Sequence, residues 1–245
     1  MRPVSNTFAP AAHPPSPGSS RPSRAADRLA ADVHAAPVDG DLILLKLSSD
    51  LYVCLPGAAA SLSADGDRLR LADADLTAAL REAGVLLEGK AGPPQLSVCC
   101  PVRDLPRPAR DLLAAPSPAF GWRDLGSIAR AVRDAVTGYW RKPLSDLVAE
   151  ALAAAPSPRR LKLDEQLIAR ARRFQVWVSF APAPGKCLLR AFLLLRHLRR
   201  HGQDARWVFG VKTWPFAAHC WLQVDDLVLD DAWERVAAYE PILVL

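Results

Sequence analysis

A cysteine in the last quarter of the chain is placed where a thiol becomes reactive. Cys187 follows a loop rich in proline and glycine, residues 181–185, and opens an apolar helical pattern that ends at Gly202. At the start of a helix, unpaired N–H groups and the helix dipole lower the pKa of a thiol, and the resulting thiolate is the nucleophile. Cys187 is therefore a candidate for nucleophilic catalysis.

A histidine and two aspartates follow in an order that could complete a catalytic triad. His219 lies in a predicted strand, 217–224, and Asp230 and Asp231 lie at the end of the next predicted strand, 227–231. An imidazole beside the thiolate can act as base and then acid, and a carboxylate can orient that imidazole.

The alternation of side chains along a strand leaves two choices for the carboxylate. If the Asp225-Asp226 turn has two residues, Asp230 shares the face of His219. One extra residue in the turn, or a bulge, transfers that role to Asp231. The pattern alone does not decide between the two.

Other polar residues have weaker claims. His197 and His201 have the i, i+4 spacing of metal ligands, but arginines surround them, and a solvated basic face explains them better. Gln175 could assist an oxyanion hole, although a polar group at the edge of the core explains it equally well. The pattern predicts no metal site and no cofactor, because phosphate loops and dinucleotide fingerprints are missing from the sequence.

The elements that must position these residues are helices and strands in alternation. Amphipathic helices are predicted around 128–140, 144–152 and 162–172, and an extended segment over 174–180. Together with the strands predicted after the helix that begins at Cys187, these elements predict an α+β, papain-like domain with an antiparallel sheet over residues 119–245.

The N-terminal half has a different texture. Residues 1–30 predict a disordered tail and residues 91–118 a proline-rich linker. Between them, residues 31–90 carry three short strand patterns, 33–38, 42–47 and 51–55, and a helix capped by Asp73 or Asp75. This order predicts a small winged-helix-like module.

Composition and charge narrow the possible functions. The chain has 245 residues, of which 50% are apolar and 23% charged, and its apolar runs are too short to span a membrane. Five cysteines without a CxxC pair favour the reducing cytoplasm over a zinc or disulfide framework. Residues 31–95 carry five basic and ten acidic side chains, which disfavours DNA as the ligand of the N-terminal module.

The segments GKCLLRAFLLLRHLRRHG (185–202) and ARWVFGVKTWPFAAHCWLQVDDLVLDDA (205–232) resemble the C-terminal domain of lasso-peptide B proteins, which are transglutaminase-like cysteine proteases. The resemblance rests on a Cys-Leu motif at the helix start, an H-x-W-x-x-V strand and an Asp twelve residues after the histidine. It implies that Cys187 is the nucleophile, His219 the base and Asp231 the orienting acid.

The resemblance also implies partners. In that family, a protease removes the leader from a lasso precursor peptide, and an ATP-dependent, asparagine-synthetase-like cyclase then closes the macrolactam. Residues 31–90 resemble the fused leader-recognition domain of the coenzyme-PQQ chaperone type. There the leader adds as a strand beside the third strand and packs on the last helix, which implies contacts with Leu51, Tyr52, Val53, Leu76 and Leu80.

Two other functions compete with leader removal. The same triad could transfer the acyl group to an amine, as transglutaminases do. Alternatively, the winged-helix-like module and the basic segment 186–206 could bind nucleic acid without catalysis. The sequence therefore predicts a cytoplasmic cysteine peptidase that does not bind nucleic acid and does not insert into a membrane.

Overall fold

The computed structural model describes residues 26–63, 67–88, 104–112, 118–119, 121–140, 142–153, 161–178 and 187–245. The chain divides into two compact units, residues 1–97 and 98–245. Both contain helices and strands, so the fold is mixed α+β, as predicted. Residues 1–25 of the predicted tail and most of the predicted linker lie outside the described residues.

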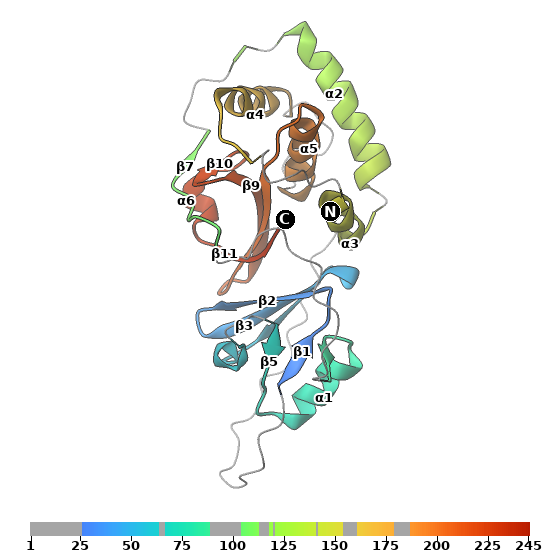
Figure 1. Cartoon of the computed structure of the whole chain (residues 1–245), viewed down its shortest axis with the longest axis vertical. Helices are drawn as coiled ribbons and strands as arrows, with labels where there is room; N and C mark the ends of the chain where they lie inside the picture. Colours follow the sequence, from blue (N-terminus) through green and yellow to red (C-terminus); the bar gives the residue numbers. More distant parts are fainter. Residues whose placement is uncertain are drawn as a thin grey trace. The chain divides into compact units, whose positions relative to one another are not determined.

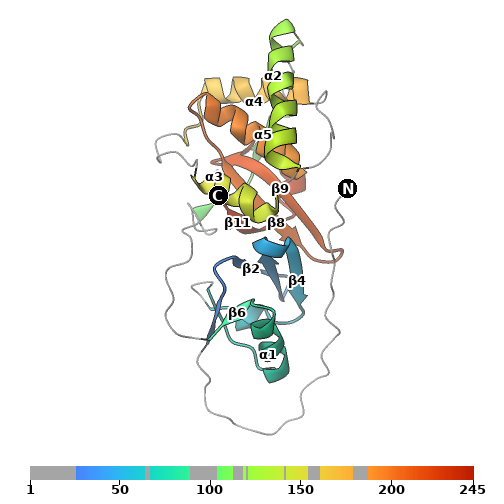
Figure 2. The ribbon, with the colours of Figure 1, turned by 90° about the vertical axis from the view of Figure 1, so that its right-hand side faces the viewer.

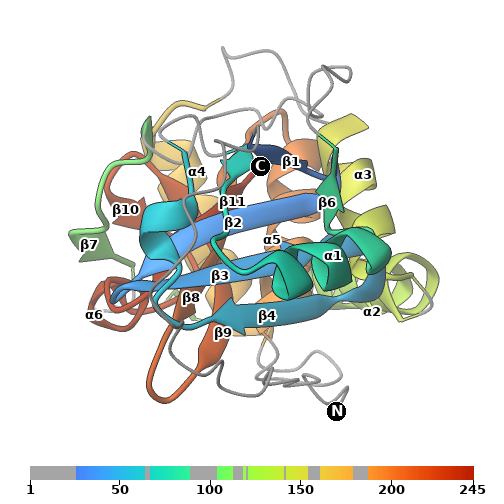
Figure 3. The same cartoon turned by 90° about the horizontal axis from the view of Figure 1, so that it is seen from below.

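The first sheet of the N-terminal unit is a three-stranded meander in the order β2-β3-β4 (Figure 3). Its strands are β2 (Val33–Val38), β3 (Asp41–Lys46) and β4 (Leu51–Leu55). Asp39 and Gly40 form the two-residue turn between β2 and β3, and both have the positive φ that such tight hairpins require. Among the described strands, only β3 pairs with β4, so the other edge of β4 is unpaired there.

A second sheet and a helix complete this unit. The sheet has the order β5-β1-β6, with β1 (Asp27–Leu29), β5 (Arg68–Leu69) and β6 (Leu86–Leu87). Helix α1 (Ala74–Glu82) begins after Asp73, one of the two predicted caps, whose carboxylate accepts hydrogen bonds from two N–H groups of the first turn.

For this unit, the winged-helix prediction is not confirmed and part of the disordered-tail prediction is wrong. The described part consists mostly of strands with one α-helix, and a winged-helix arrangement is not shown, because the segment after β4 forms only a short 3-10 turn, η2 (Ala59–Ser61). The predicted disordered tail is wrong for residues 27–29, which form β1. The partners of β1 are β5 and β6, about 40 to 60 residues away, so the local composition could not reveal this strand.

The C-terminal unit is built on one sheet in the order β11-β8-β9-β10-β7. Its central strands are β8 (Arg206–Lys212) and β9 (Ala217–Val224), flanked by β11 (Glu240–Val244) and the short β10 (Leu227–Val228). These strands pair antiparallel, as predicted. Strand β7 (Arg110–Asp111), from the segment predicted to be a linker, pairs parallel with β10.

The helices of this unit are α2 (Trp122–Asp134), which continues into the π-helical η4 (Ala135–Tyr139), α3 (Leu144–Ala153), α4 (Glu165–Val178), α5 (Cys187–Arg200) and the short α6 (Trp233–Val236). Helix α5 lies beside α4 and covers the sheet (Figures 1 and 2). The rings of Phe192 on α5 and Trp207 on β8 meet with 6.4 Å between their centroids. No helix in the described ranges is both long and apolar enough to cross a bilayer.

One helix replaces a predicted extended segment. Residues 174–178 belong to α4, whereas their apolar run predicted an extended segment over 174–180. Phe174 and Trp177 are buried three residues apart and pack edge to face, with centroids 4.6 Å apart. Their spacing continues the helical phase of Leu167 and Ala171, and a short apolar run does not distinguish this phase from that of a strand.

Candidate active site

The site is built at an unpaired edge of β9. Strand β8 pairs with residues 217–223 of β9, whereas β10 pairs only with residues 223 and 224 on the other side. Beyond this point the N-terminal half of β9, which carries His219, has no strand partner on that side among the described residues. His219 lies directly opposite Gly210 of β8.

Asp231, not Asp230, contacts the imidazole. The Nε2 atom of His219 lies 2.7 Å from Oδ2 of Asp231. The turn has two residues, because Val224 pairs with Leu227, and for a continuous strand this favours Asp230. The strand is not continuous.

The backbone at the end of β10 determines which of the two carboxylates contacts His219. Leu229 still donates its N–H to Leu222, but Oδ1 of Asp230 then accepts the N–H of Leu222 at 2.8 Å. A side chain thus occupies the place that the backbone would take in the ladder. The chain leaves the sheet at this residue, and the carboxylate of Asp231 reaches His219.

Cys187 is the first residue of α5, as predicted, and its side chain is half-buried. Its thiol is hydrogen-bonded to the side chain of Cys220, to the backbone N–H of Cys220 and to His219. Since Nε2 of the imidazole faces Asp231, Nδ1 is the nitrogen that remains for the thiol. The predicted loop before Cys187 lies outside the described residues.

These contacts favour a thiolate–imidazolium pair. The hydrogen bond from Cys220, together with the hydrogen bond and charge of His219, lowers the pKa of Cys187 to about 4 in spite of burial. Burial opposes a charged imidazole, but hydrogen bonds to Asp231 and Cys187 outweigh it and raise the pKa of His219 to about 9. Between these values the sulfur is a nucleophile and the imidazole holds a proton.

The part of the chain that carries this site matches a known protein family. Residues 129–244 match the family described as the transglutaminase-like superfamily. This region is a transglutaminase-like core domain. The match indicates a cysteine-dependent hydrolase or transferase. No curated protein and no solved structure matches the chain.

Arg190 on α5 lies close to both aspartates of the transglutaminase-like site. Nη2 of Arg190 lies 2.9 Å from Oδ2 of Asp231, and its Nε lies 3.8 Å from Oδ2 of Asp230. Burial opposes ionisation of Asp231, but the hydrogen bonds of His219 and Ala232 and the charge of Arg190 lower its pKa to about 2. Asp230 is buried more deeply, and burial raises its pKa to about 7 despite Arg190.

Two aromatic rings flank the imidazole. The ring of Trp221 is stacked on that of His219 with 6.3 Å between centroids, and the ring of Tyr239 lies at 5.4 Å. Trp221 donates its indole N–H to Gln223 at 2.9 Å, so a polar contact fixes its orientation. Gly210 leaves the space that these rings need: a Cβ there would lie 2.8 Å from the Trp221 ring.

Two other polar candidates, Gln175 and His197, contact Leu229 and Trp177. Gln175 lies on α4 and donates its amide N–H to the carbonyl of Leu229 at 2.9 Å, which ties α4 to the segment after β10. His197 packs edge to face against Trp177, and burial lowers its pKa to about 4. The described residues contain no cluster of His, Cys, Asp and Glu side chains that could hold a metal ion.

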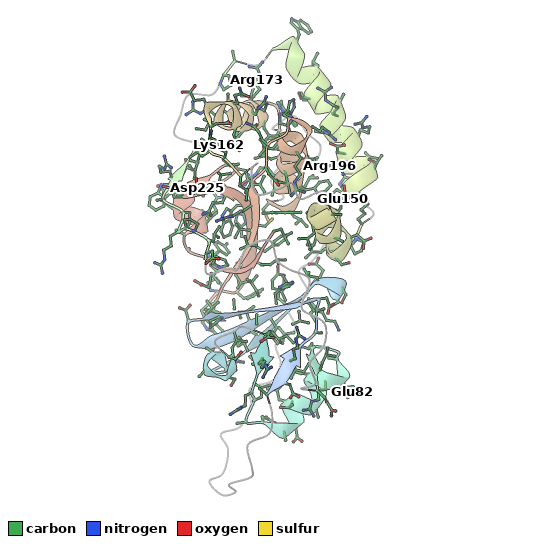
Figure 4. All side chains as sticks on the ribbon, viewed as in Figure 1. Glu82, Glu150, Lys162, Arg173, Arg196 and Asp225 are labelled. Carbon is green, nitrogen blue, oxygen red and sulfur yellow. The ribbon has the colours of Figure 1, made fainter. Side chains whose placement is uncertain are left out.

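The basic segment proposed for nucleic-acid binding is largely engaged by partners within the chain. Arg190 binds Asp231, Arg196 binds Glu150 (Figure 4), and Arg199 binds Asp204. Arg200 binds Asp134 and Arg206 reaches the carbonyl of Asp104. Because these cations are paired, the segment offers much less charge to a phosphate backbone than its composition predicts.

Sequence reasoning missed Arg190, Cys220 and Tyr239. Arg190 stands three residues after Cys187, so it lies on the same helical face, and an arginine within an apolar helix was the available signal. Cys220 is adjacent to His219, but strand alternation alone predicts that it points away. No pattern in the sequence relates Tyr239 to the site.

Proposed function

We propose that the protein is a cysteine peptidase that removes the leader from a lasso-type precursor peptide. The observation that carries the proposal is the position of His219, hydrogen-bonded to Cys187 on one side and to Asp231 on the other. This is the arrangement that acyl transfer through a thioester requires.

The reaction follows from the protonation states. The Cys187 thiolate attacks the carbonyl carbon at the junction of leader and core, and the backbone N–H of Cys187, in the first turn of α5, stabilises the oxyanion. His219 gives its proton to the leaving amine, which becomes the N-terminus of the core. His219 then takes a proton from water, which hydrolyses the thioester and releases the leader with a free carboxyl group.

The N-terminal unit serves to capture the leader in this proposal. The unpaired edge of β4 offers backbone N–H and C=O groups to an added strand. Of the predicted contact residues, Leu51, Val53 and Leu76 are half-buried, whereas Tyr52 and Leu80 are buried. The half-buried residues are therefore the ones that a peptide can reach. A cyclase that uses the released amine is the expected partner.

The test is cleavage of the cognate precursor, followed by mass spectrometry. The Cys187→Ala variant is expected to lose cleavage, while Cys99→Ala, which removes a different thiol of the chain, retains it. Cleavage by Cys187→Ala at the rate of the unchanged protein would contradict the proposal. A leader fragment joined to an amine, rather than one with a free carboxyl group, would assign the protein to acyl transfer instead.

A further inference from the structure

The candidate nucleophile contacts a second thiol that the proposed reaction does not use. Cys220 lies in β9 opposite Phe209, and only 2% of its surface is exposed. Its side chain is hydrogen-bonded to that of Cys187. Leu222 directs its N–H and C=O toward β10, and backbone direction alternates along a strand, so the N–H of Cys220 points to the same edge. Cys187 therefore lies where it meets both the backbone and the thiol of Cys220.

The two sulfurs have opposite reactivity. Cys187 is half-buried at the start of α5 and paired with an imidazolium, so an oxidant in solvent can reach a thiolate there. Cys220 is enclosed, and burial raises its pKa well above the ordinary value. Its thiol therefore stays protonated and out of reach of solvent. One sulfur is thus suited to be oxidised first, and the other to react only with its neighbour.

We propose that Cys187 and Cys220 form an oxidative modification site, in which a hydroperoxide oxidises Cys187 and Cys220 then closes a disulfide with it. In the first step the Cys187 thiolate attacks one peroxide oxygen, the O–O bond breaks, and Cys187 becomes a sulfenic acid. The other oxygen takes a proton from the His219 imidazolium and leaves in an alcohol or water. In the second step the Cys220 sulfur attacks the sulfenic sulfur. The S–O bond breaks, and the hydroxide leaves as water with the proton of the Cys220 thiol. The two cysteines lose two electrons, and the peroxide gains them.

The consequence for activity rests on the proposed function. A disulfide would block the nucleophile reversibly, because a dithiol reductant regenerates both thiols. It would also spare Cys187 the irreversible sulfinic and sulfonic states. The thiol chemistry itself does not depend on what the enzyme cleaves, so it can be tested without a substrate.

The experiment treats the full chain with hydrogen peroxide and follows intact mass, iodoacetamide labelling of Cys187 and peptide maps. The unchanged protein is expected to lose two hydrogen masses, to yield a Cys187–Cys220 cross-linked peptide, and to recover its labelling fully with dithiothreitol. Cys220→Ala is expected to gain two or three oxygen atoms at Cys187 and not to recover. Cys54→Ala is the matched control and should behave like the unchanged protein.

Three results would overturn the inference. They are irreversible oxygen addition in the unchanged protein at the rate of Cys220→Ala, a disulfide that excludes Cys220, and complete recovery of Cys220→Ala with dithiothreitol. If Cys220→Ala does not fold, the peptide map of the unchanged protein still decides. Disulfide formation without any peptidase activity would reject only the proposed function, whereas peptidase activity without disulfide formation would reject only this site.

Discussion

The Nε2 atom of His219 lies 2.7 Å from Oδ2 of Asp231, although the preceding residue, Asp230, is the one that simple strand alternation favours. Asp230 instead binds the backbone N–H of Leu222 and is almost completely buried. Two adjacent carboxylates therefore have separate roles. One orients the imidazole, and the other supports the backbone that places it.

This division predicts different effects for two equivalent substitutions. Asp231→Asn removes the charge that stabilises the imidazolium, and we expect kcat to fall by about 10² to 10⁴. Asp230→Asn keeps an oxygen for the N–H of Leu222 and should retain most of the activity. Cleavage kinetics of the two variants test this, and a greater loss in Asp230→Asn would reverse the assignment.

Asp230→Asn also has an expected pH signature in stability. Burial raises the pKa of Asp230 from 3.8 to about 7, so the folded state holds this proton more tightly than the unfolded state. The unchanged protein should therefore lose stability, relative to Asp230→Asn, as the pH rises from about 4 through 7. Denaturant unfolding of both proteins across this range measures the difference between their free energies of unfolding. A difference that does not change with pH would contradict the raised pKa of Asp230.

The reactivity of Cys187 should be nearly independent of pH over a wide range. Since its pKa is lowered to about 4 and that of His219 is raised to about 9, the thiolate–imidazolium pair persists between these values. We expect the rate of iodoacetamide alkylation to be flat between about pH 5 and 8, whereas an ordinary thiol reacts about tenfold more slowly for each unit below its pKa. His219→Ala removes the imidazolium and should make the alkylation rate rise with pH across this range. A steady rise from pH 5 to 9 in the unchanged protein would contradict the ion pair.

Two arginines contact Asp231 and differ in exposure. The side chain of Arg190 is 25% exposed and lies near both aspartates, whereas that of Arg235 is 63% exposed and reaches only Asp231. Arg190→Gln leaves buried charge uncompensated and should lower the free energy of unfolding by about 3 kcal/mol, whereas Arg235→Gln should lower it by less than about 1 kcal/mol. Arg190→Gln should also shift the pH profile of Cys187 alkylation, which a purely structural loss would not do.

Gly210 should be intolerant of a side chain. A Cβ at this position would lie within 3.0 Å of the Trp221 ring and of Cβ of Tyr239, the two residues whose rings flank His219. Gly210→Ala is expected to lower stability by about 1–3 kcal/mol through overpacking, and to reduce kcat. Gly126→Ala, where the nearest atom is the flexible end of Arg130 at 3.7 Å, should instead be neutral or stabilising by up to about 1 kcal/mol. Thermal unfolding compares the two variants.

Leader binding should depend on the half-buried side of α1. Leu76→Glu places a charge where the proposed leader packs, and we expect its affinity for a fluorescent leader peptide to fall by at least about tenfold, since loss of one buried leucine contact is worth about 1.5 kcal/mol or more. Ala78→Glu adds the same charge at an exposed position of α1 and should bind normally. Equal affinities in anisotropy measurements would place the leader elsewhere.

Local patterns in the sequence were enough to predict the elements that carry the reactive residues. The start of α5 at Cys187 and the strand around His219 follow from proline and glycine residues and from apolar periodicity, which act over a few residues. For the cap of α1, the pattern left Asp73 and Asp75 open, and the structure has Asp73. The same reasoning misassigned residues 174–178 of α4, because a short apolar run fits two periods.

Tertiary structure alone decided how these elements meet. Strand β10 ends at Val228, and Asp231 then lies beside His219. This arrangement depends on Asp230, whose side chain accepts the N–H of Leu222 on β9 in place of a backbone carbonyl. The contacts of Cys187 with Cys220, and of Arg190 with the two aspartates, join segments more than 30 residues apart. Such contacts depend on where strands end and which edges stay unpaired. These features arise from hydrogen bonding across the whole sheet, and no local window of the sequence contains them.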